Sequence, residues 1–411
     1  MYNCLRIASC AVLACLLAHS GSAAQANEPS AKITVRIDMR APIKAGWFDP
    51  KTETVGLRGG SSPLSWGTTL PAVDPDRDGV YDVRFTVPVR PSRTAFLSHK
   101  FKVDGTDNPN DGWENGPNRP LLITRPGAIV TRAFDAAGPP FPNTLRGRVS
   151  RHPAFPSTFV QARDVTVLLP AEYATATRRR FPVIYLHDGQ NLFNAAEGNG
   201  GEWQVDESSI ALVRARRVEP VIVVGVHSVS DRRVDDYTPT PMARDTPNGL
   251  LSFGGKADAY GRFLVNELKP FIDRTYRTQA SADRTALGGS SLGGLVTLHL
   301  GLKYPAVFGT LFVVSPSVWW DEMSIVKGVD ALGERTAQRI WLDMGTNEGP
   351  GALEQARLLR DALVRKGWNL GTDLRFREYA GAGHDESAWA ARFGEMLEFA
   401  FPGPGLSRAT R

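Results

Sequence analysis

The sequence predicts an α/β protein in two parts: a mostly parallel sheet covered by helices, preceded by a small all-β sandwich. Near-continuous apolar runs interleaved with amphipathic stretches predict the parallel sheet, because such strands are buried on both faces. A glycine-rich turn at 288–294 joins one of these runs to a helix. Short alternating strands separated by Pro and Gly clusters predict the sandwich over 31–135.

The composition of the 411 residues is that of an ordinary globular protein, with 42% hydrophobic and 22% charged residues. The net charge of +5 is small for this length, and no long run of Lys and Arg occurs. We interpret the three arginines at 178–180 as a solvated loop. Binding to nucleic acid is therefore not expected.

Residues 1–26 have the pattern of a signal peptide. Arg6 supplies a positive charge, 7–17 form an apolar stretch, and Ala-Gln-Ala at 24–26 is a cleavage site. The apolar stretch is too short to span a bilayer, so we expect a secreted or periplasmic protein without a membrane span. A lipoprotein signal at 12–15 is the alternative.

The positions of the cysteines limit the chemistry that the mature chain can carry out. All three lie in the leader, at Cys4, Cys10 and Cys15. The remaining sequence therefore has no disulfide, no thiolate metal ligand and no cysteine nucleophile. We expect neither a metal nor another cofactor.

In the predicted sandwich, alternating apolar residues mark strands at 33–37, 81–87 and 101–103. The acidic sequence Asp-Pro-Asp-Arg-Asp-Gly at 74–79 matches the opening of an EF-hand calcium loop. Phe85, however, stands where that loop needs a bidentate Glu, and a strand follows in place of a helix. We therefore interpret 74–79 as an acidic hairpin turn, with a weak calcium site as the alternative.

Two tryptophans of the sandwich, Trp66 and Trp113, lie in loops rich in Gly, Pro and Asn, where burial is not the default. Exposed indoles are flat apolar plates that can stack on sugar rings. Leu-Ser-Trp at 64–66, His-Lys-Phe at 99–101 and Trp-Glu-Asn-Gly-Pro-Asn-Arg at 113–119 give the segment a resemblance to the starch-binding type of carbohydrate-binding module.

That resemblance implies a carbohydrate site, and a polysaccharide as partner. The residues that would line it are Trp66, Lys100, Trp113 and Asn118. The alternative is that Trp113 packs on its own loop and that the domain only docks on its neighbour.

Residues 136–146 are rich in Pro and Gly and are predicted to form a stiff hinge before a second domain at 147–402. We expect the hinge to tether the sandwich without bringing it to the reacting groups of the second domain. Amphipathic helices are predicted there at 257–276 and 353–366. Strands are predicted at 165–169, 183–186, 221–226, 285–287, 311–314 and 340–344.

The turn at 288–294 contains the pattern Gly-x-Ser-x-Gly, with Ser291 at its centre. Strand, tight turn and helix are the context in which this pattern forms a nucleophile elbow. The flanking glycines let the backbone turn sharply without a Cβ clash, so that Ser291 projects above the sheet. This context favours a catalytic serine over a glycine-rich turn without chemistry.

The general base follows by elimination. In an α/β-hydrolase the histidine comes after the nucleophile and the acid in chain order, and only His299 and His384 follow Ser291. His299 is eight residues along the same helix, about 12 Å up its axis, and cannot reach the hydroxyl. His384 lies in a glycine-rich loop before a helix at 387–399, where the base of such a triad belongs.

The acid is expected between them, at the carboxyl end of a strand. Glu348 lies in the turn after the strand at 340–344, where its carboxylate would orient the imidazole. Asp343 is the competitor, but it lies inside that strand, which favours a structural role. We therefore favour Glu348.

An oxyanion hole needs two backbone N–H groups near the nucleophile. Leu292, directly after Ser291, is expected to supply one. Gly189, in the loop after the strand at 183–186, is the candidate for the other, because no side chain blocks the backbone there. His187 precedes the nucleophile and is interpreted as a structural residue of that turn.

At these residues the second domain resembles the putative-esterase family of α/β-hydrolases, which includes feruloyl, acetylxylan and enterobactin-type esterases and mycolyl transferases. The resemblance covers about 145–400. It is carried by the elbow and by the sequence motifs at 187–193, 233–239, 315–320 and 383–385.

The resemblance implies hydrolysis of a small-molecule or carbohydrate ester through an acyl-enzyme on Ser291. Trp203, Trp319 and Trp320 are candidates for the pocket wall, with burial in the core as the alternative for two of them. Transfer of the acyl group to a sugar by the same triad, or an inactive carbohydrate-binding protein, are the other functional readings.

Overall fold

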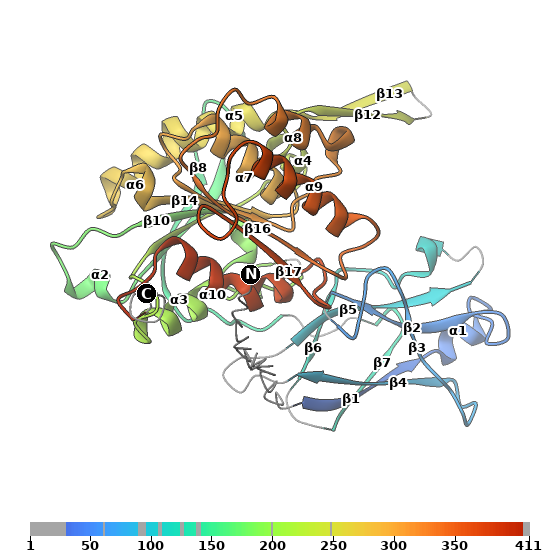
Figure 1. Ribbon diagram of the computed structural model, residues 1–411. Coiled ribbons are helices and arrows are strands. Elements are labelled where there is room, and N and C mark those ends of the chain that lie inside the picture. Colours follow the sequence, from blue (N-terminus) through green and yellow to red (C-terminus); the bar gives the residue numbers. More distant parts are fainter. Residues whose placement is uncertain are drawn as a thin grey trace, which may run out of the picture.

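The computed structural model describes residues 30–60, 62–88, 96–105, 109–123, 127–136, 141–198, 200–246 and 249–405. The expected signal peptide, with its three cysteines, and residues 137–140 of the expected hinge lie outside these ranges. Figure 1 shows the N-terminal domain, in blue and cyan, beside the larger second domain. The predicted fold class is confirmed for both domains.

The N-terminal domain is a sandwich of two sheets. One has the order β4-β1-β7 and the other the order β3-β2-β5-β6, and only the β1–β7 pair is parallel. Apolar residues that alternate along β1, such as Ile33 and Val35, share one buried core with Leu57 and Phe101 of the other sheet. The strands are β1 (Ser30–Asp38), β2 (Thr54–Gly59), β3 (Leu70–Pro71), β4 (Val80–Pro88), β5 (Phe96–Asp104), β6 (Arg119–Leu122) and β7 (Ala128–Ala133), with a short helix α1 (Arg40–Lys44) after β1.

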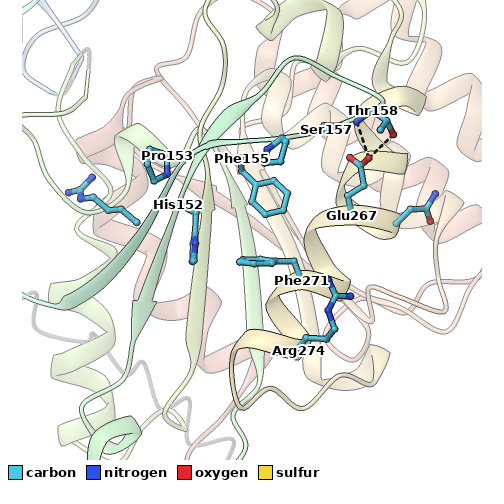
Figure 2. Close-up of a pocket in the computed structure, with 11 residues that line it drawn as sticks. His152, Pro153, Phe155, Ser157, Thr158, Glu267, Phe271 and Arg274 are labelled. Atoms are coloured by element: carbon cyan, nitrogen blue, oxygen red, sulfur yellow. Dashed lines mark hydrogen bonds between the residues drawn. The ribbon is translucent and has the colours of Figure 1, made fainter.

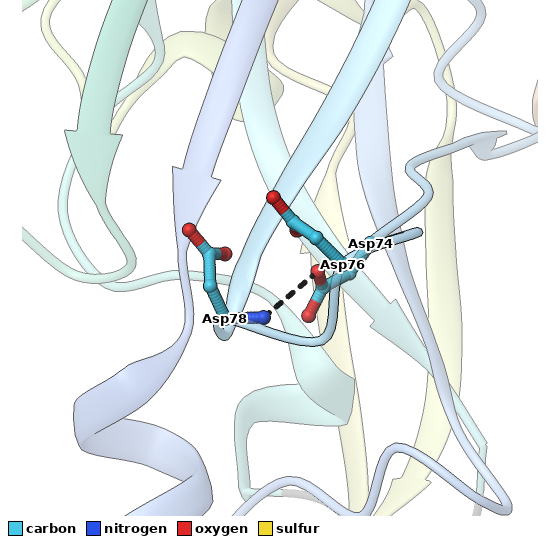
Figure 3. Close-up of side chains that lie close together, drawn as sticks. All are labelled: Asp74, Asp76 and Asp78. Carbon is cyan, nitrogen blue, oxygen red and sulfur yellow. Dashed lines mark hydrogen bonds between the residues drawn. The ribbon is translucent and has the colours of Figure 1, made fainter.

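The acidic segment at 74–79 is a turn before β4, flanked by an antiparallel bridge between Val73 and Asp82. The carboxylate of Asp74 accepts hydrogen bonds from the backbone N–H groups of Asp78 (3.2 Å) and Gly79 (2.9 Å). Figure 3 shows the carboxylates of Asp74, Asp76 and Asp78 gathered around this turn. The predicted hairpin turn is thus explained by amide capping, which requires no ion.

The second domain contains an eight-stranded sheet with the order β17-β16-β15-β14-β10-β11-β9-β8. The strands from β17 to β11 in this order run parallel, whereas β9 and β8 are antiparallel to their neighbours. Every residue of β10, β11, β14 and β15 is buried, as expected for strands covered on both faces. The strands are β8 (Arg148–Phe155), β9 (Arg163–Leu169), β10 (Val183–His187), β11 (Ile222–Val226), β14 (Thr285–Ser290), β15 (Thr310–Val314), β16 (Arg339–Gly345) and β17 (Leu374–Tyr379).

Helices cover both faces of this sheet. Successive residues of a strand point to opposite faces, so they belong to two separate cores. Val183 and Tyr185 of β10 belong to one core, while Ile184 and Leu186 belong to the other. The first core packs under α5 (Ala257–Arg262), a π-helical turn η3 (Phe263–Leu268), α6 (Lys269–Thr275), α7 (Leu292–Lys303), α8 (Trp320–Asp330) and α9 (Ala352–Arg365). The second packs under α3 (Val205–Arg214) and α10 (Glu386–Ala400).

Three smaller elements complete the domain: α2 (Glu172–Thr175), α4 (Arg233–Tyr237) and a two-stranded hairpin of β12 (Pro241–Thr246) and β13 (Gly249–Gly254). The hairpin projects from the upper right of the domain in Figure 1. Among the described residues, no helix combines the length and the apolar character that crossing a bilayer requires.

The two domains are packed against each other, in line with the alternative that the sandwich docks on its neighbour. Phe96 of β5 lies against Gly201 of the second domain and makes an edge-to-face contact with Phe141 of the connecting segment, with ring centroids 5.3 Å apart. Thr144 is fixed to the second domain, because its Oγ1 accepts a hydrogen bond from the backbone N–H of Ala195 (2.9 Å). Pro and Gly content alone could not reveal these contacts.

Candidate active site

Ser291 lies at a sharp turn between β14 and α7. Its φ of 59° and ψ of −125° are in a sparsely populated region that a non-glycine residue adopts only under strong constraint. Its backbone N–H donates to the carbonyl of Val314 (3.0 Å), which holds the turn. A Cβ on Gly294 would lie 2.8 Å from the same carbonyl oxygen, so glycine is required for α7 to start this close to β15.

His384 and Glu348 meet at the same end of the sheet. Nδ1 of His384 lies 2.8 Å from Oε2 of Glu348, and this contact leaves Nε2 on the opposite edge of the ring. Glu348 follows β16 and His384 follows β17, which is the parallel neighbour of β16. The carboxyl ends of parallel strands lie at one edge of the sheet. Ser291, which follows β14, therefore lies at the same edge as Glu348 and His384.

The other oxygen of Glu348 is held by a network that sequence reasoning did not find. Oε1 accepts hydrogen bonds from the hydroxyl of Ser315 (2.6 Å) and the backbone N–H of Gly345 (2.6 Å). The Ser315 hydroxyl in turn accepts from the indole N–H of Trp389 (3.0 Å) and the guanidinium of Arg392 (2.6 Å). With both acceptor positions filled, its single proton is directed to Glu348.

The charge state of Glu348 follows from its surroundings. Burial raises the pKa of this carboxyl, but the hydrogen bond and charge of His384 and the charge of Arg392 outweigh it, and the pKa ends below its ordinary value. Glu348 is thus ionised at neutral pH, as an orienting acid must be. Asp343 is fully buried, and burial raises its pKa. Its carboxylate accepts from the indole of Trp341 (2.7 Å) and pairs with Arg392, so the structure does not bring Asp343 to His384.

Ser291 and His384 line the same cavity, of about 340 Å³. All but one of the residues that line it are polar, and the exception, Trp389, packs edge-to-face on the His384 ring at 5.1 Å. The lining consists of Asp188, Gln190, Asn191, Ser228, Ser230, Arg233, Ser290, Ser291, His384, Glu386 and Trp389.

Three charged side chains, Asp188, Arg233 and Glu386, line this cavity, and none of them was a candidate site residue from the sequence. Arg233 of α4 forms a fork of two 2.8 Å hydrogen bonds with the carboxylate of Asp188. Glu386, two residues after His384, accepts a hydrogen bond from the side-chain amide of Asn191 (3.0 Å). Burial raises the pKa of Glu386 to about 7, so this carboxyl is partly protonated near neutral pH. Asp188 and Arg233 lie in the sequence motifs at 187–193 and 233–239, whereas Glu386 lies just after the motif at 383–385.

The candidate oxyanion-hole residues lie after the carboxyl ends of two neighbouring parallel strands, Gly189 after β10 and Leu292 after β14. Leu292 is the first residue of α7, where backbone N–H groups have no partner within the helix. Gly189 begins a short 3₁₀ turn, η2 (Gly189–Asn191), and a Cβ there would lie 2.6 Å from the carbonyl carbon of Gly225. Glycine at 189 therefore lets this turn approach β11. The hydroxyl of Ser317, 3.3 Å from the Ser291 hydroxyl, is a further polar neighbour that the sequence did not single out.

The three tryptophans expected at the pocket wall do not line this cavity. Trp203 is buried behind Trp389, with ring centroids 5.8 Å apart. Trp320 is buried against Phe253 of the β12–β13 hairpin, and its indole N–H donates to the carbonyl of Thr240 (2.9 Å). Trp319 is 51% exposed beside it. The alternative of burial in the core thus describes Trp203 and Trp320.

Three further histidines have partners outside the candidate triad. His187 is buried and hydrogen-bonded to the hydroxyl of Tyr260 (2.9 Å), and burial lowers its pKa to about 3. His299 contacts Asp258 (2.9 Å) on the helix surface. His152 lines a second groove of about 740 Å³ along β8, with Phe155 and Phe271 (Figure 2). This groove is separated from β14 by the strands β10, β11 and β9. The imidazole of His152 is hydrogen-bonded to the hydroxyl of Tyr276 (2.7 Å).

The structure brings the two sandwich tryptophans together. The ring centroids of Trp66 and Trp113 lie 6.1 Å apart, and both side chains are half-buried. Arg58 and Lys102 lie over the Trp113 ring, at 5.2 and 5.5 Å from its centroid. Nζ of Lys100 donates to the carbonyl of Gly116 (2.7 Å) in the same loop. Asn118 lies at the domain interface, with its Nδ2 3.7 Å from the position of a Cβ on Gly200.

The sequence of the chain was compared with protein families and with known proteins. The family model described as "Putative esterase" matches residues 157–400. The ferri-bacillibactin esterase BesA of Bacillus subtilis (strain 168) is 30% identical over 255 residues, which cover 55% of this chain and 82% of that protein. The siderophore enterobactin esterase of Emericella nidulans is 38% identical over 167 residues, covering 38% of this chain and 52% of that protein.

Among solved structures, the enterobactin esterase FES from Shigella flexneri, in the presence of enterobactin, matches with a TM-score of 0.57 at 16% identity. The match covers 85% of this chain and 88% of that chain. At this identity the likeness concerns the fold. Its extent exceeds the second domain alone, so part of the sandwich is included.

Proposed function

Because the chain belongs to the putative-esterase family and is a carboxylic ester hydrolase, we propose that it works through an acyl-enzyme on Ser291. His384 acts as general base and acid, and Glu348 orients it. The observation that carries this proposal is the 2.8 Å contact between His384 and Glu348 beside a cavity that Ser291 also lines. We do not propose an inactive carbohydrate-binding protein, because the family is one of esterases.

In the proposed first step, Nε2 of His384 takes the proton of the Ser291 hydroxyl as the oxygen attacks the ester carbonyl. Backbone N–H groups of Leu292 and of the η2 turn stabilise the negative oxygen that develops on the carbonyl. His384 then gives the proton to the departing alcohol, which leaves the acyl group on Ser291. A water molecule, deprotonated by the same imidazole, releases the acid. The His384 side chain is 39% exposed, which favours this attack by water over transfer to a sugar.

The polar lining supports a substrate rich in hydroxyl groups. Arg233, Glu386 and the two serines at 228 and 230 offer charged and hydroxyl partners, whereas a long aliphatic chain would find one indole. Acyl groups attached to a sugar fit this lining, and the Trp66–Trp113 pair supports a carbohydrate site on the sandwich. Secretion or export to the periplasm, expected from 1–26, is compatible with such a substrate.

A second candidate substrate is a siderophore ester. It is favoured by the 30% identity to the ferri-bacillibactin esterase over most of that protein's length. The polar lining of the cavity does not by itself separate this candidate from an acylated sugar, so both are included in the test.

The test is a panel of esters assayed with the wild-type protein and with Ser291→Ala. Acetylated and feruloylated sugars, a catecholate siderophore triester and a long-chain nitrophenyl ester form the panel. We expect a higher kcat/KM for the hydroxyl-bearing esters than for the long-chain ester, and loss of all activity in the variant. A preference for the long-chain ester would contradict the polar substrate, and residual activity of Ser291→Ala would contradict the acyl-enzyme.

A further inference from the structure

Three carboxylates converge at the start of α3, outside the reaction cavity. Glu202 precedes the helix, and Asp206 and Glu207 lie in its first turn. One oxygen from each of the three lies within 4.8 Å of the other two. Glu202 is 2% exposed and Asp206 is fully buried, so water does not screen their charges from one another.

Most of the oxygens in this cluster lack a hydrogen bond of ordinary geometry in the described part of the chain, although the Thr144 hydroxyl lies close enough to Glu202 to offset part of the rise in pKa that burial causes. Both carboxylate oxygens of Glu202, Oδ1 of Asp206 and Oε2 of Glu207 are buried without such a hydrogen bond. Oδ2 of Asp206, in contrast, accepts from the backbone N–H groups of Arg146 (2.6 Å) and Gly147 (2.9 Å). A buried carboxylate oxygen without a donor is costly, and native proteins pair it with a hydrogen-bond donor or with a cation.

No protein cation lies in contact with these carboxylates in the described ranges, although the positive charge of Arg146 acts on Glu202 and offsets part of the rise in its pKa that burial causes. Across the described ranges, none of the three carboxylates forms an ion pair with a Lys, Arg or His side chain within 4.0 Å. The cluster therefore has three properties in one place: its groups carry like charges, they are buried, and several of their acceptor oxygens are unpaired. These are the properties of a ligand set for a hard metal ion.

We propose that Glu202, Asp206 and Glu207 bind one Ca²⁺ ion that fastens the connecting segment to α3. The ligands are all oxygen, which fits a hard cation and not zinc. Ca²⁺–oxygen distances of about 2.3–2.6 Å allow ligand oxygens up to about 5 Å apart, in line with the observed spread. Mg²⁺ keeps several of its waters, for which a pocket this buried has little room.

The expected role of this ion is structural. The Asp206 carboxylate already holds the backbone N–H groups at 146 and 147, and a bound ion would fix that carboxylate from its other side. None of the three ligands lines the cavity of Ser291 and His384, so the reaction itself does not use the ion. No metal was expected at these residues from the sequence, because the three carboxylates form no known calcium-loop pattern.

The test uses the full chain, freed of metal with a chelator and then titrated with CaCl₂. We expect isothermal titration to give one Ca²⁺ per chain and thermal unfolding to move to higher temperature as Ca²⁺ is added. Glu207→Gln and Glu202→Gln, which keep the side-chain shape, should each weaken binding at least about tenfold by removing a ligand charge. Asp76→Asn, in the surface turn of Figure 3, is the matched control and should bind as the wild type does.

Two results would overturn the assignment. Wild-type protein that takes up no Ca²⁺ at millimolar concentration and shows no shift of Tm would mean that the carboxylates share protons instead of a metal. Binding that is lost in Asp76→Asn and kept in Glu207→Gln would move the ion to the surface turn. Circular dichroism of each variant shows whether it is folded, and either glutamine variant alone suffices for the comparison.

Discussion

A Cβ atom added to Gly60 of the sandwich would lie 2.5 Å from the Cβ of Asp385, the residue after the candidate base His384. Asp385 caps α10, because its Oδ1 accepts hydrogen bonds from the backbone N–H groups of Ser387 (2.9 Å) and Ala388 (3.2 Å). The sandwich therefore packs on the loop that holds His384. This contact connects the N-terminal domain to the geometry of the proposed reaction.

The first prediction is that Gly60→Ala lowers kcat by about tenfold or more, because the added methyl group displaces the loop of His384. Gly67→Ala is the matched control, since a Cβ there meets only the Ser65 hydroxyl, at 3.7 Å. Steady-state kinetics on a small soluble ester measures the effect, and the Tm of both variants reports on folding. A folded Gly60→Ala protein with wild-type kcat would show that the sandwich does not position the loop.

The second prediction concerns the acid. Glu348→Gln should lower kcat by about 10²- to 10⁴-fold, because His384 loses the charge that stabilises its protonated form. Asp343→Asn should lower kcat less and Tm more, since Asp343 is buried between Trp341 and Arg392. The two variants are compared by kinetics and thermal unfolding. The reverse order of kcat values would transfer the role of the acid to Asp343.

The third prediction concerns pH and Glu386. Its pKa is raised from 4.5 to about 7, with burial as the main cause and the charges of Asp385 and Asp188 adding to it. The folded state then binds more protons than the unfolded state between these pH values, so this residue makes stability fall as pH rises from 4.5 to 7. Above pH 7 its contribution stays constant.

Glu386→Gln removes that titration. The difference in Tm between variant and wild type should therefore grow in favour of the variant across this pH range and then level off. Glu202 and Glu207 also have raised pKa values, but they are present in both proteins and cancel in the difference. A difference in Tm that is independent of pH would contradict the raised pKa of Glu386.

Much of the candidate site is local in sequence, which is why the sequence predicts it. The elbow around Ser291 needs only a strand, a glycine turn and a helix, and His384 follows from chain order. Glu348 follows from its place at the end of a strand. The network of Ser315, Trp389 and Arg392 has no such local signal, because it forms only when β15, β16 and α10 pack together.

Two features of the structure could not be predicted from the sequence, for the same physical reason. Trp203, Trp319 and Trp320 were candidates for the pocket wall, with burial in the core as the alternative for two of them, and the sequence around an indole does not tell which outcome applies. The Pro and Gly content of 136–146 indicates a connecting segment, but it does not reveal that Phe96 and Gly60 lie against the second domain. Both outcomes depend on contacts between residues far apart in the chain.

The fourth prediction concerns carbohydrate binding by the sandwich. If Trp66 and Trp113 stack on sugar rings, the double variant Trp66→Ala/Trp113→Ala should weaken retention on starch or a related glucan several-fold to about tenfold. Its turnover of a small soluble ester should stay unchanged, because neither indole lines the cavity of Ser291. Pull-down and kinetics give the two values. Absence of glucan retention in the wild type would leave the sandwich with a positioning role alone.

The central claim is that Ser291 carries the acyl group, and covalent labelling tests it most directly. Mass spectrometry of the protein after reaction with a fluorophosphonate should locate one adduct on Ser291. Ser291→Ala should take up no label and keep a Tm close to that of the wild type, while Ser290→Ala should still be labelled. An adduct on Ser290 or Ser317, or labelling that persists in Ser291→Ala, would contradict the account.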